Sequence, residues 1–166
     1  TMNDRGKPLS PVDMLKAYLL APIEEQDARL QANQIWKQQV LELISWGGEH
    51  EPERDANCIK AWLRAQYAES IRERKAGSVD KDWELIGSVF HRWVRENNSR
   101  LGLGKAQENQ NMMAVSFPFF AKAYLRILNS SKHYTPKLRA VYYNAHNDFT
   151  WQNTVLLASL IETDDD

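Results

Sequence analysis

The sequence has little of what several protein classes need. Cys58 is its only cysteine, so the chain can form no internal disulfide and has no cysteine spacing typical of a metal site. No apolar run approaches the roughly 18 to 20 residues that cross a bilayer. The formal net charge is −1, so no global field attracts nucleic acid or anionic lipid. These absences predict a cytoplasmic protein without a membrane-spanning helix and without a metal site.

Glycine and proline are also scarce, at seven and six residues, and strand-like alternation of Val, Ile and Thr is rare. The 166 residues, 43% hydrophobic and 26% charged, suit one soluble globular domain. Six tryptophans predict a core or a covered interface rich in indole rings. We therefore predict a single helical domain over residues 1–166. Its class is all-α, an irregular bundle of about six to seven helices.

Capping residues and apolar periodicity place the helices. Ser10 is a good N-cap, Pro11 fits the first helical position, and Asp13 stands where a capping box wants an acid. The first helix is thus expected to end at Leu20. A second helix is expected over residues 23–46. A third is expected to begin after the polar loop 49–55 and to end near Gly77. Four more are expected over residues 80–97, 112–128, 136–146 and 151–161. Residues 97–111 are expected to form a long loop, and Pro118 predicts a kink or a restart.

Basic residues cluster loosely near aromatic residues, as on many nucleic-acid-binding surfaces. The third expected helix carries Arg64, Arg72, Arg74 and Lys75 on its outer face, and the fourth carries Arg92 and Arg95. The arginines at positions 72, 74, 92 and 95 are the candidate contacts to a nucleic-acid backbone. Acidic residues are interleaved throughout, however, and this interleaving favours the alternative of solvated helix faces.

Three other stretches invite a chemical interpretation. "LGLGKA", residues 101–106, has the glycines of a phosphate loop but lacks the preceding glycine, the hydroxyl after the lysine and a preceding strand. A loop between helices is favoured there. In "NAHNDF", His146 stands two residues from Asp148, as an oriented base would. A helix end that favours histidine through its dipole is the commoner arrangement. The Met and Phe residues over 112–120 are expected to form core rather than a ligand pocket.

"NDRGKPLS", residues 3–10, is the strongest local signal for binding. Asn3 tolerates a tight turn, and the guanidinium of Arg5 offers a forked set of donors to an anion. Ser10 then begins a helix whose free amides also favour anions. Asn3, Arg5 and Lys7 are therefore candidate nucleotide- or phosphate-facing residues. A turn followed by a capped helix explains the same residues equally well.

Residues 1–20, "TMNDRGKPLSPVDMLKAYLL", resemble the signature N-x-R-G-x-P-L-S-x-x-D-[LM]-[LI]-K-x-[YF]-L of a large bacterial family of unknown-function domains. This family includes the S part of GmrSD-type, modification-dependent (type IV) restriction enzymes. Residues 147–162 also resemble a later stretch of that family's helical region. The residues that match the signature are Asn3, Arg5, Gly6, Pro8, Leu9, Ser10, Asp13, Lys16 and Leu19.

The resemblance implies a multidomain protein. Family members pair a ParB/sulfiredoxin-like, nucleotide-hydrolysing N-terminal domain with the helical region, often followed by an HNH-type nuclease domain. This chain would then be a C-terminal helical piece, with Thr1 as the end of a lead-in segment. The family's aspartate-glycine-glutamine-glutamine-arginine nucleotide motif and the HNH pattern are both absent from the sequence. The expected partners are the ParB-like domain, DNA, an HNH-type nuclease domain and a second copy of the chain.

The expected function is accordingly a non-catalytic support or coupling domain of a restriction or phage-defence protein. It would contribute to nucleotide-dependent DNA recognition or cleavage by the intact protein. The chain itself is expected to hold no catalytic residue and no cofactor, whereas nucleotide triphosphate and a divalent metal would belong to the intact protein. Two alternatives remain open: a protein–protein interaction module, and a self-contained enzyme that uses His146 and Asp148.

Overall fold

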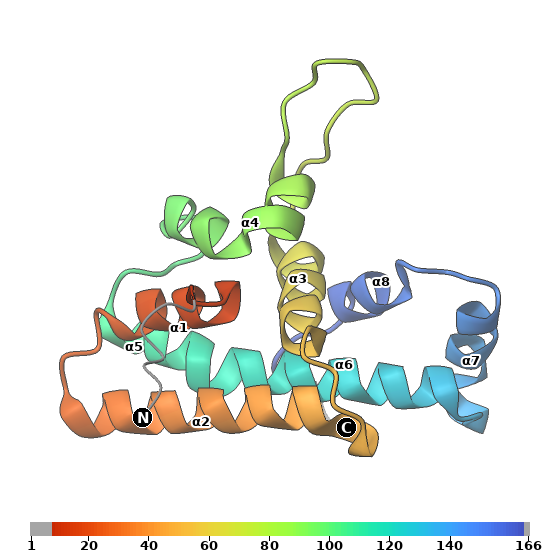
Figure 1. Ribbon diagram of the computed structural model, residues 1–166, viewed down its shortest axis with the longest axis horizontal. Coiled ribbons are helices and arrows are strands. Elements are labelled where there is room, and N and C mark those ends of the chain that lie inside the picture. The colour runs from red at the N-terminus through yellow and green to blue at the C-terminus, as the bar shows by residue number, and fades with distance from the viewer. Residues whose placement is uncertain (1–7, 165–166) are drawn as a thin grey trace.

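The computed structural model describes residues 8–164 (Figure 1). Within that range the chain forms helices and loops and no strand, which confirms the all-α prediction. A π-helix, Met112–Ser116, joins α5 to α6, and two short 3₁₀ turns span Trp46–Gly48 and Pro136–Leu138. The α-helices are α1 (Pro11–Leu20), α2 (Gln26–Ser45), α3 (Arg54–Tyr67), α4 (Asp82–Glu96), α5 (Ala106–Asn111), α6 (Phe117–Lys132), α7 (Arg139–His146) and α8 (Gln152–Ala158).

The body of the molecule is built on two long helices. α2 and α6 lie side by side along the longest dimension, and α3 stands across them (Figure 1). α1 and α4 pack together toward one end, whereas α7 and α8 pack on α6 toward the other. Within residues 8–164, no helix is long and apolar enough to cross a membrane.

Aromatic rings from α2, α3 and α6 meet where these helices cross. The Trp36 and Phe117 ring centroids lie 4.3 Å apart, and Trp62 packs against Phe117 and Phe120 at 5.9 and 5.7 Å. All four side chains are buried. Rings at such separations contribute packing energy beyond the area they bury, so this cluster is the centre of the core. The prediction that the tryptophans lie in a core is confirmed for Trp36, Trp62 and Trp93, whereas Trp151 is 50% exposed.

The start of α1 follows the predicted capping pattern. The Asp13 N–H donates to Ser10 Oγ at 3.1 Å, and the Ser10 hydroxyl donates to the Asp13 carboxylate at 2.8 Å. Lys16 Nζ lies 3.3 Å from the same carboxylate. Partial burial alone would raise the pKa of Asp13, but the bonds from Ser10 and Lys16 outweigh it and hold that pKa below its usual value. Three residues of the N-terminal signature thus form one local network.

The third predicted helix is wrong beyond Tyr67. The chain leaves helical geometry at Ala68, which has φ −73° and ψ 119°, and α4 begins only at Asp82. The reason is tertiary. The carbonyl of Tyr67 accepts a bond from Arg100 at 2.9 Å, and the Glu69 N–H donates to Asp82 at 3.0 Å. Bonds to residues far along the chain replace the next helical turn.

Other boundaries also differ from the prediction. The predicted loop over 97–111 gives way to α5 at Ala106. Pro118 directly follows the π-helix, and the residues at both junctions, Met112 and Ser116, keep right-handed helical geometry. The helical path therefore runs unbroken through Pro118, and the predicted restart is wrong. The helix that follows runs to Lys132 rather than to residue 128. The last helix ends at Ala158. Beyond it, the carbonyls of Leu157 and Leu160 accept hydrogen bonds from the Gln66 side chain of α3.

Arg64 is not on an outer face, as the sequence suggested, but lies between α3 and α4. Its Nε and Nη2 both donate to the Trp83 carbonyl, at 3.0 and 2.9 Å, and its guanidinium lies 4.5 Å from the centroid of that indole. The Trp83 ring in turn packs against Trp151 at 4.8 Å. A side chain at Gly87 would overlap the Arg64 guanidinium. This stack links α3, α4 and the start of α8.

Candidate functional site

The predicted basic residues fall partly on an arm, residues 68–81, that projects from the body between α3 and α4 (Figure 1). Its two limbs are joined at the base. The Trp83 N–H donates to the Ser70 carbonyl at 3.1 Å, and the Arg72 N–H donates to Glu84 Oε2 at 3.0 Å. Glu84 also accepts from the N-cap residue of α4. The base of the arm therefore continues directly into the first turn of α4.

Asp82 is the centre of a polar network under the arm. Its Oδ1 accepts the Trp93 indole N–H at 2.9 Å, and its Oδ2 accepts the Glu69 N–H at 3.0 Å and Arg100 Nη2 at 3.1 Å. Arg100 also donates to the Tyr67 carbonyl. Burial alone would raise the pKa of Asp82, but these three donors outweigh it and hold the pKa below its usual value. An ionised carboxylate thus ties both ends of the arm to the body.

The outer part of the arm turns back at its tip. The Ser78 N–H donates to the Lys75 carbonyl at 3.2 Å, and Gly77 has a φ of +78°, which a glycine adopts without steric cost. Two aliphatic side chains on the arm are open to solvent: Ile71 is 52% exposed and Val79 is 79% exposed. The arm buries little apolar surface, so its position depends on the network at its base.

Residues 71–75 carry three cationic side chains and one carboxylate, a local net charge of +2. Arg72 Nη1 lies 2.9 Å from Asp80 on the opposite limb, and Lys75 Nζ lies 3.5 Å from Glu73. Arg74 forms no ion pair with a residue in the described part of the chain. All five side chains are exposed, and exposed pairs of this kind are weak. The arginines remain accessible to a phosphate.

Arg92 and Arg95 form a second basic patch, on α4. Both side chains are exposed. They lie ten and thirteen residues beyond Asp82, or roughly 15 to 20 Å along a helix, and α4 is bent at Val89 (φ −142°). Burial, followed by the charges of these two arginines, lowers the pKa of the neighbouring His91. The four predicted arginines therefore occupy two separate places, the arm and the far half of α4.

The remaining predicted residues give no further site. Asn3, Arg5 and Lys7 lie outside the described residues, which begin at position 8. His146 ends α7, where its Nδ1 lies 2.8 Å from the Tyr142 carbonyl and its ring packs on the ring of that tyrosine. Its nearest polar partner is thus on its own helix rather than at Asp148. This geometry suits a helix end better than an oriented catalytic base.

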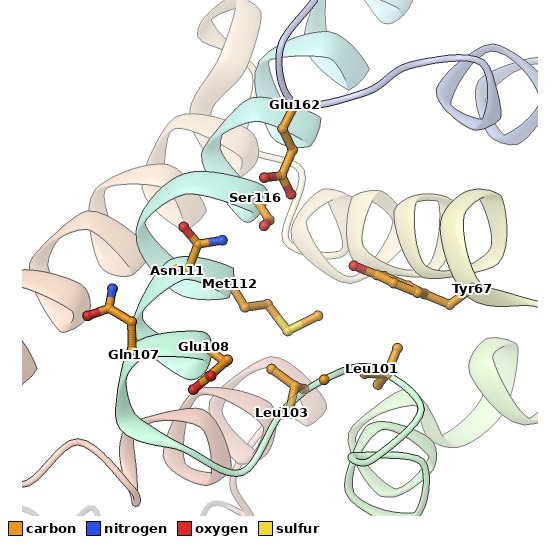
Figure 2. A pocket seen from close by; sticks show the side chains of 10 residues that line it. Tyr67, Leu101, Leu103, Gln107, Glu108, Asn111, Met112, Ser116 and Glu162 are labelled. Atoms are coloured by element: carbon orange, nitrogen blue, oxygen red, sulfur yellow. The ribbon is translucent and has the colours of Figure 1, made fainter.

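A cavity of about 370 Å³ lies on the side of the molecule where the C-terminal end of α3 approaches the π-helix (Figure 2). Four segments line it: the end of α3, the loop 101–103, the α5–π-helix junction and the residues after α8. A π-helix turn is uncommon and is frequent at functional sites. The lining residues are Tyr67, Leu101, Gly102, Leu103, Gln107, Glu108, Asn111, Met112, Ser116 and Glu162.

The rim of this cavity is fixed by a fully buried amide. Asn109 Oδ1 accepts the Gly104 N–H at 2.9 Å, and its Nδ2 donates to the Leu19 carbonyl at 3.0 Å. The Leu103 N–H donates to the Asn98 carbonyl at 2.8 Å. These bonds anchor the glycine-containing loop onto α1 and onto the end of α4. The rim is built by hydrogen bonds and does not depend on apolar contact alone.

The polar groups around the cavity are acidic or neutral. Glu162 and Glu108 lie on opposite sides of it, with the Met112 side chain between them (Figure 2). Ser116 is 5% exposed and makes no hydrogen bond with any residue in positions 8–164. Burial, followed by the charge of Glu162, raises the pKa of Tyr67, so the phenol is neutral at pH 7. Lysine, arginine and histidine are all missing from the lining residues.

The sequence missed this cavity. The "LGLGKA" stretch forms part of the rim of the cavity. Glu108 and Glu162 make the cavity negatively charged, which disfavours phosphate, and Lys105 is not among the lining residues. Met112, expected in the core, is buried but also lines the cavity. Tyr67, Ser116 and Glu162 lie far apart in the chain, so no local spacing could have revealed them as neighbours.

Comparison of the chain with protein-family models, with curated proteins and with solved structures found no match.

Proposed function

We propose that the chain is a non-catalytic helical module of a restriction-type or phage-defence protein, which contacts nucleic-acid backbone through its arm and couples that contact to other domains. The observation that carries the proposal is the arm itself. Arg72, Arg74 and Lys75 stand together on a segment that projects from the body. Phosphate contacts by arginine and lysine supply most sequence-independent affinity for DNA.

The network under the arm supports the same proposal. A projecting segment that buries little apolar surface gains a defined position only from bonds at its base. Asp82 supplies three such bonds and Arg100 a fourth. Fixed cations lose less conformational entropy on binding than cations on a free loop. The acidic residues Glu73 and Asp80 limit the affinity, because they pair with Lys75 and Arg72 and so compete with phosphate for these cations.

The N-terminal signature supports the wider assignment. Its resemblance to the restriction-enzyme family implies a neighbouring nucleotide-hydrolysing domain, and Asn3, Arg5 and Lys7 would face a phosphate at that junction. The proposal predicts that Arg5→Ala lowers nucleotide hydrolysis by the intact multidomain protein at least about tenfold, since a forked donor is lost from a charged ligand. Unchanged hydrolysis would show that Arg5 has no such role.

The arm is tested by binding of a fluorescent DNA duplex, followed by anisotropy at about 50 mM salt. The triple variant Arg72→Gln, Arg74→Gln, Lys75→Gln removes three positive charges from the arm. A matched control removes three exposed charges from α2 and α7, with Arg29→Gln, Lys37→Gln and Arg139→Gln. Affinity should fall at least about tenfold in the arm variant and less than about threefold in the control.

Equal losses in the two variants would mean that only net charge matters, and the arm would not be the contact. Arg92→Gln with Arg95→Gln addresses the second patch in the same assay. We expect a loss smaller than that of the arm variant, because that patch holds two charges instead of three. A larger loss would move the principal contact from the arm to α4.

A protein partner for the arm is the second candidate. The exposed Ile71 and Val79 side chains favour it, since aliphatic groups contribute little to phosphate contacts. Replacing both by Ser should leave DNA affinity within about twofold and weaken a protein contact. If the arm serves a protein partner instead, wild-type chain will not bind duplex at about 50 mM salt.

A further inference from the structure

We infer that the cavity beside the π-helix is a binding site for a short aliphatic diamine, a class of ligand unrelated to the nucleic acid proposed for the arm. The site combines a volume of about 370 Å³ with two exposed carboxylates on opposite sides, a serine hydroxyl that faces the cavity and three apolar side chains, those of Leu101, Leu103 and Met112. Pockets of this size suit small organic ligands.

The charge of the lining determines the sign of the ligand. Glu108 and Glu162 are its ionisable acids, Tyr67 is neutral, and the lining contains no basic side chain. An ammonium group can donate to a carboxylate and to Ser116 or Tyr67 at the same time. Charge-assisted bonds of this kind are about twice as strong as neutral ones. An anion would meet two carboxylates and no compensating cation.

The shape of the lining determines the rest of the ligand. Met112 lies between the two carboxylates in Figure 2, and Leu101 and Leu103 lie on the same side of the cavity as Glu108. A methylene chain would lie against these apolar side chains while its ends turn toward the two acids. Methionine adapts its shape to such a chain. One ammonium at each end of the chain pairs with Glu162 and with Glu108.

A metal ion fits the same donors less well. A cation such as Ca²⁺ or Mg²⁺ needs six or more oxygen ligands close together. No group of three or more His, Cys, Asp or Glu side chains within residues 8–164 is placed to hold a metal ion. Two carboxylates separated by a methionine side chain instead match two separate positive charges joined by an apolar spacer.

Ser116 is the most specific feature of the site. Ser116 is the last residue of the π-helix, is 5% exposed and lies next to Glu162 (Figure 2). Its hydroxyl makes no hydrogen bond within residues 8–164 and is open to solvent through the cavity. A ligand ammonium would satisfy it as an acceptor. The π-helix thus presents a hydroxyl to the cavity, where a ligand ammonium would replace water.

Isothermal titration calorimetry with 1,4-diaminobutane tests this inference, with butylamine and 1,4-butanediol as matched probes. The diamine should bind saturably, butylamine about tenfold more weakly, and the uncharged diol not measurably. Glu162→Gln and Glu108→Gln should each weaken diamine binding at least about tenfold, and Ser116→Ala about three- to tenfold, in line with bonds to charged groups. Glu96→Gln, an exposed acid on α4, is the control and should have no effect.

Binding of the diol as tightly as the diamine, or equal losses in Glu162→Gln and Glu96→Gln, would overturn the inference. Methyl NMR of methionine locates the site independently of affinity. On addition of the diamine, the Met112 methyl resonance should shift, while that of Met14 on α1, which does not line the cavity, should stay in place. Shifts of Met14 without Met112 would place the ligand elsewhere. Circular dichroism of each variant confirms that the helices are retained.

Discussion

The body and the arm of this protein are held by opposite kinds of interaction. Where α2, α3 and α6 cross, Trp36, Trp62 and Phe117 are in ring contact and buried. The arm, in contrast, leaves most of its side chains in solvent and depends on hydrogen bonds to Asp82. Apolar burial supplies stability without direction, whereas charged bonds supply direction with modest net stability. The difference indicates that the body keeps the protein folded and the network keeps the arm in place.

The largest expected effect comes from breaking the aromatic core. Trp62→Ala removes a fully buried indole that contacts Phe117 and Phe120. We expect a loss of about 3 to 5 kcal/mol in the free energy of unfolding, measured by urea denaturation. Trp62→Phe is the control. The indole N–H of Trp62 makes no hydrogen bond within residues 8–164, so the ring matters more than its donor, and the loss should be clearly smaller. Equal losses would contradict this view of the core.

Breaking the network should have a smaller and more local effect. Asp82→Asn keeps the shape of the side chain but removes its charge. The new amide NH₂ cannot accept a hydrogen bond, so at least one donor among Trp93, Glu69 and Arg100 loses its acceptor. We expect a loss of about 2 to 4 kcal/mol. Hydrogen exchange should rise at the Glu69 and Trp83 amides more than in α2. Uniform exchange changes throughout the body would show that Asp82 supports the whole fold and not the arm in particular.

Low pH should remove the stability that the ionised Asp82 side chain contributes. The pKa of Asp82 is lower in the folded protein than its ordinary value of 3.8, so the folded state prefers the ionised carboxylate. The resulting stability is fully present well above pH 3.8 and is lost as the pH falls through 3.8 toward the folded-state pKa. Urea titrations at about pH 7 and about pH 3 should therefore show the gap between wild type and Asp82→Asn shrinking in acid. A gap that stays constant would mean that the charge of Asp82 contributes nothing.

The smallest expected effect on stability is that of the arm cations. The Arg72–Asp80 and Lys75–Glu73 pairs are exposed, and such pairs contribute about 0 to 1 kcal/mol. Replacing Arg72, Arg74 and Lys75 by Gln should change the free energy of unfolding by less than about 1 kcal/mol. Thermal unfolding checks this. A larger loss would mean that these side chains maintain the fold and that their effect on binding is indirect.

Local signals in the sequence predicted local structure correctly. Ser10 and Asp13 cap α1 as expected, because the bonds involved join residues three positions apart. The end of α3 at Tyr67 was missed, because it depends on Arg100, thirty-three residues further along the chain. The helical continuation to Gly77 had good local propensity and was overridden by tertiary contact. A helix end fixed in this way leaves no trace in periodicity or capping.

The candidate sites show the same division. Arg72 and Arg74 were recognised as basic residues, but on a helix face instead of a projecting arm. The acidic cavity was missed entirely, because its determinants, Tyr67, Ser116 and Glu162, come together only when α3, the π-helix and the end of the chain meet. Sequence patterns thus identified residues with useful chemistry and could not identify which of them share a site.

The most direct test of the proposed function is the salt dependence of duplex binding by the wild type and by the variant that carries Arg72→Gln, Arg74→Gln and Lys75→Gln. Each phosphate neutralised contributes roughly 0.9 to the slope of log affinity against log salt concentration. If the arm is the contact, the slope falls by roughly 0.9 for each of these cations that meets a phosphate. An unchanged slope, with affinity equal to that of the wild type, would contradict the account, because the arm would then touch no phosphate.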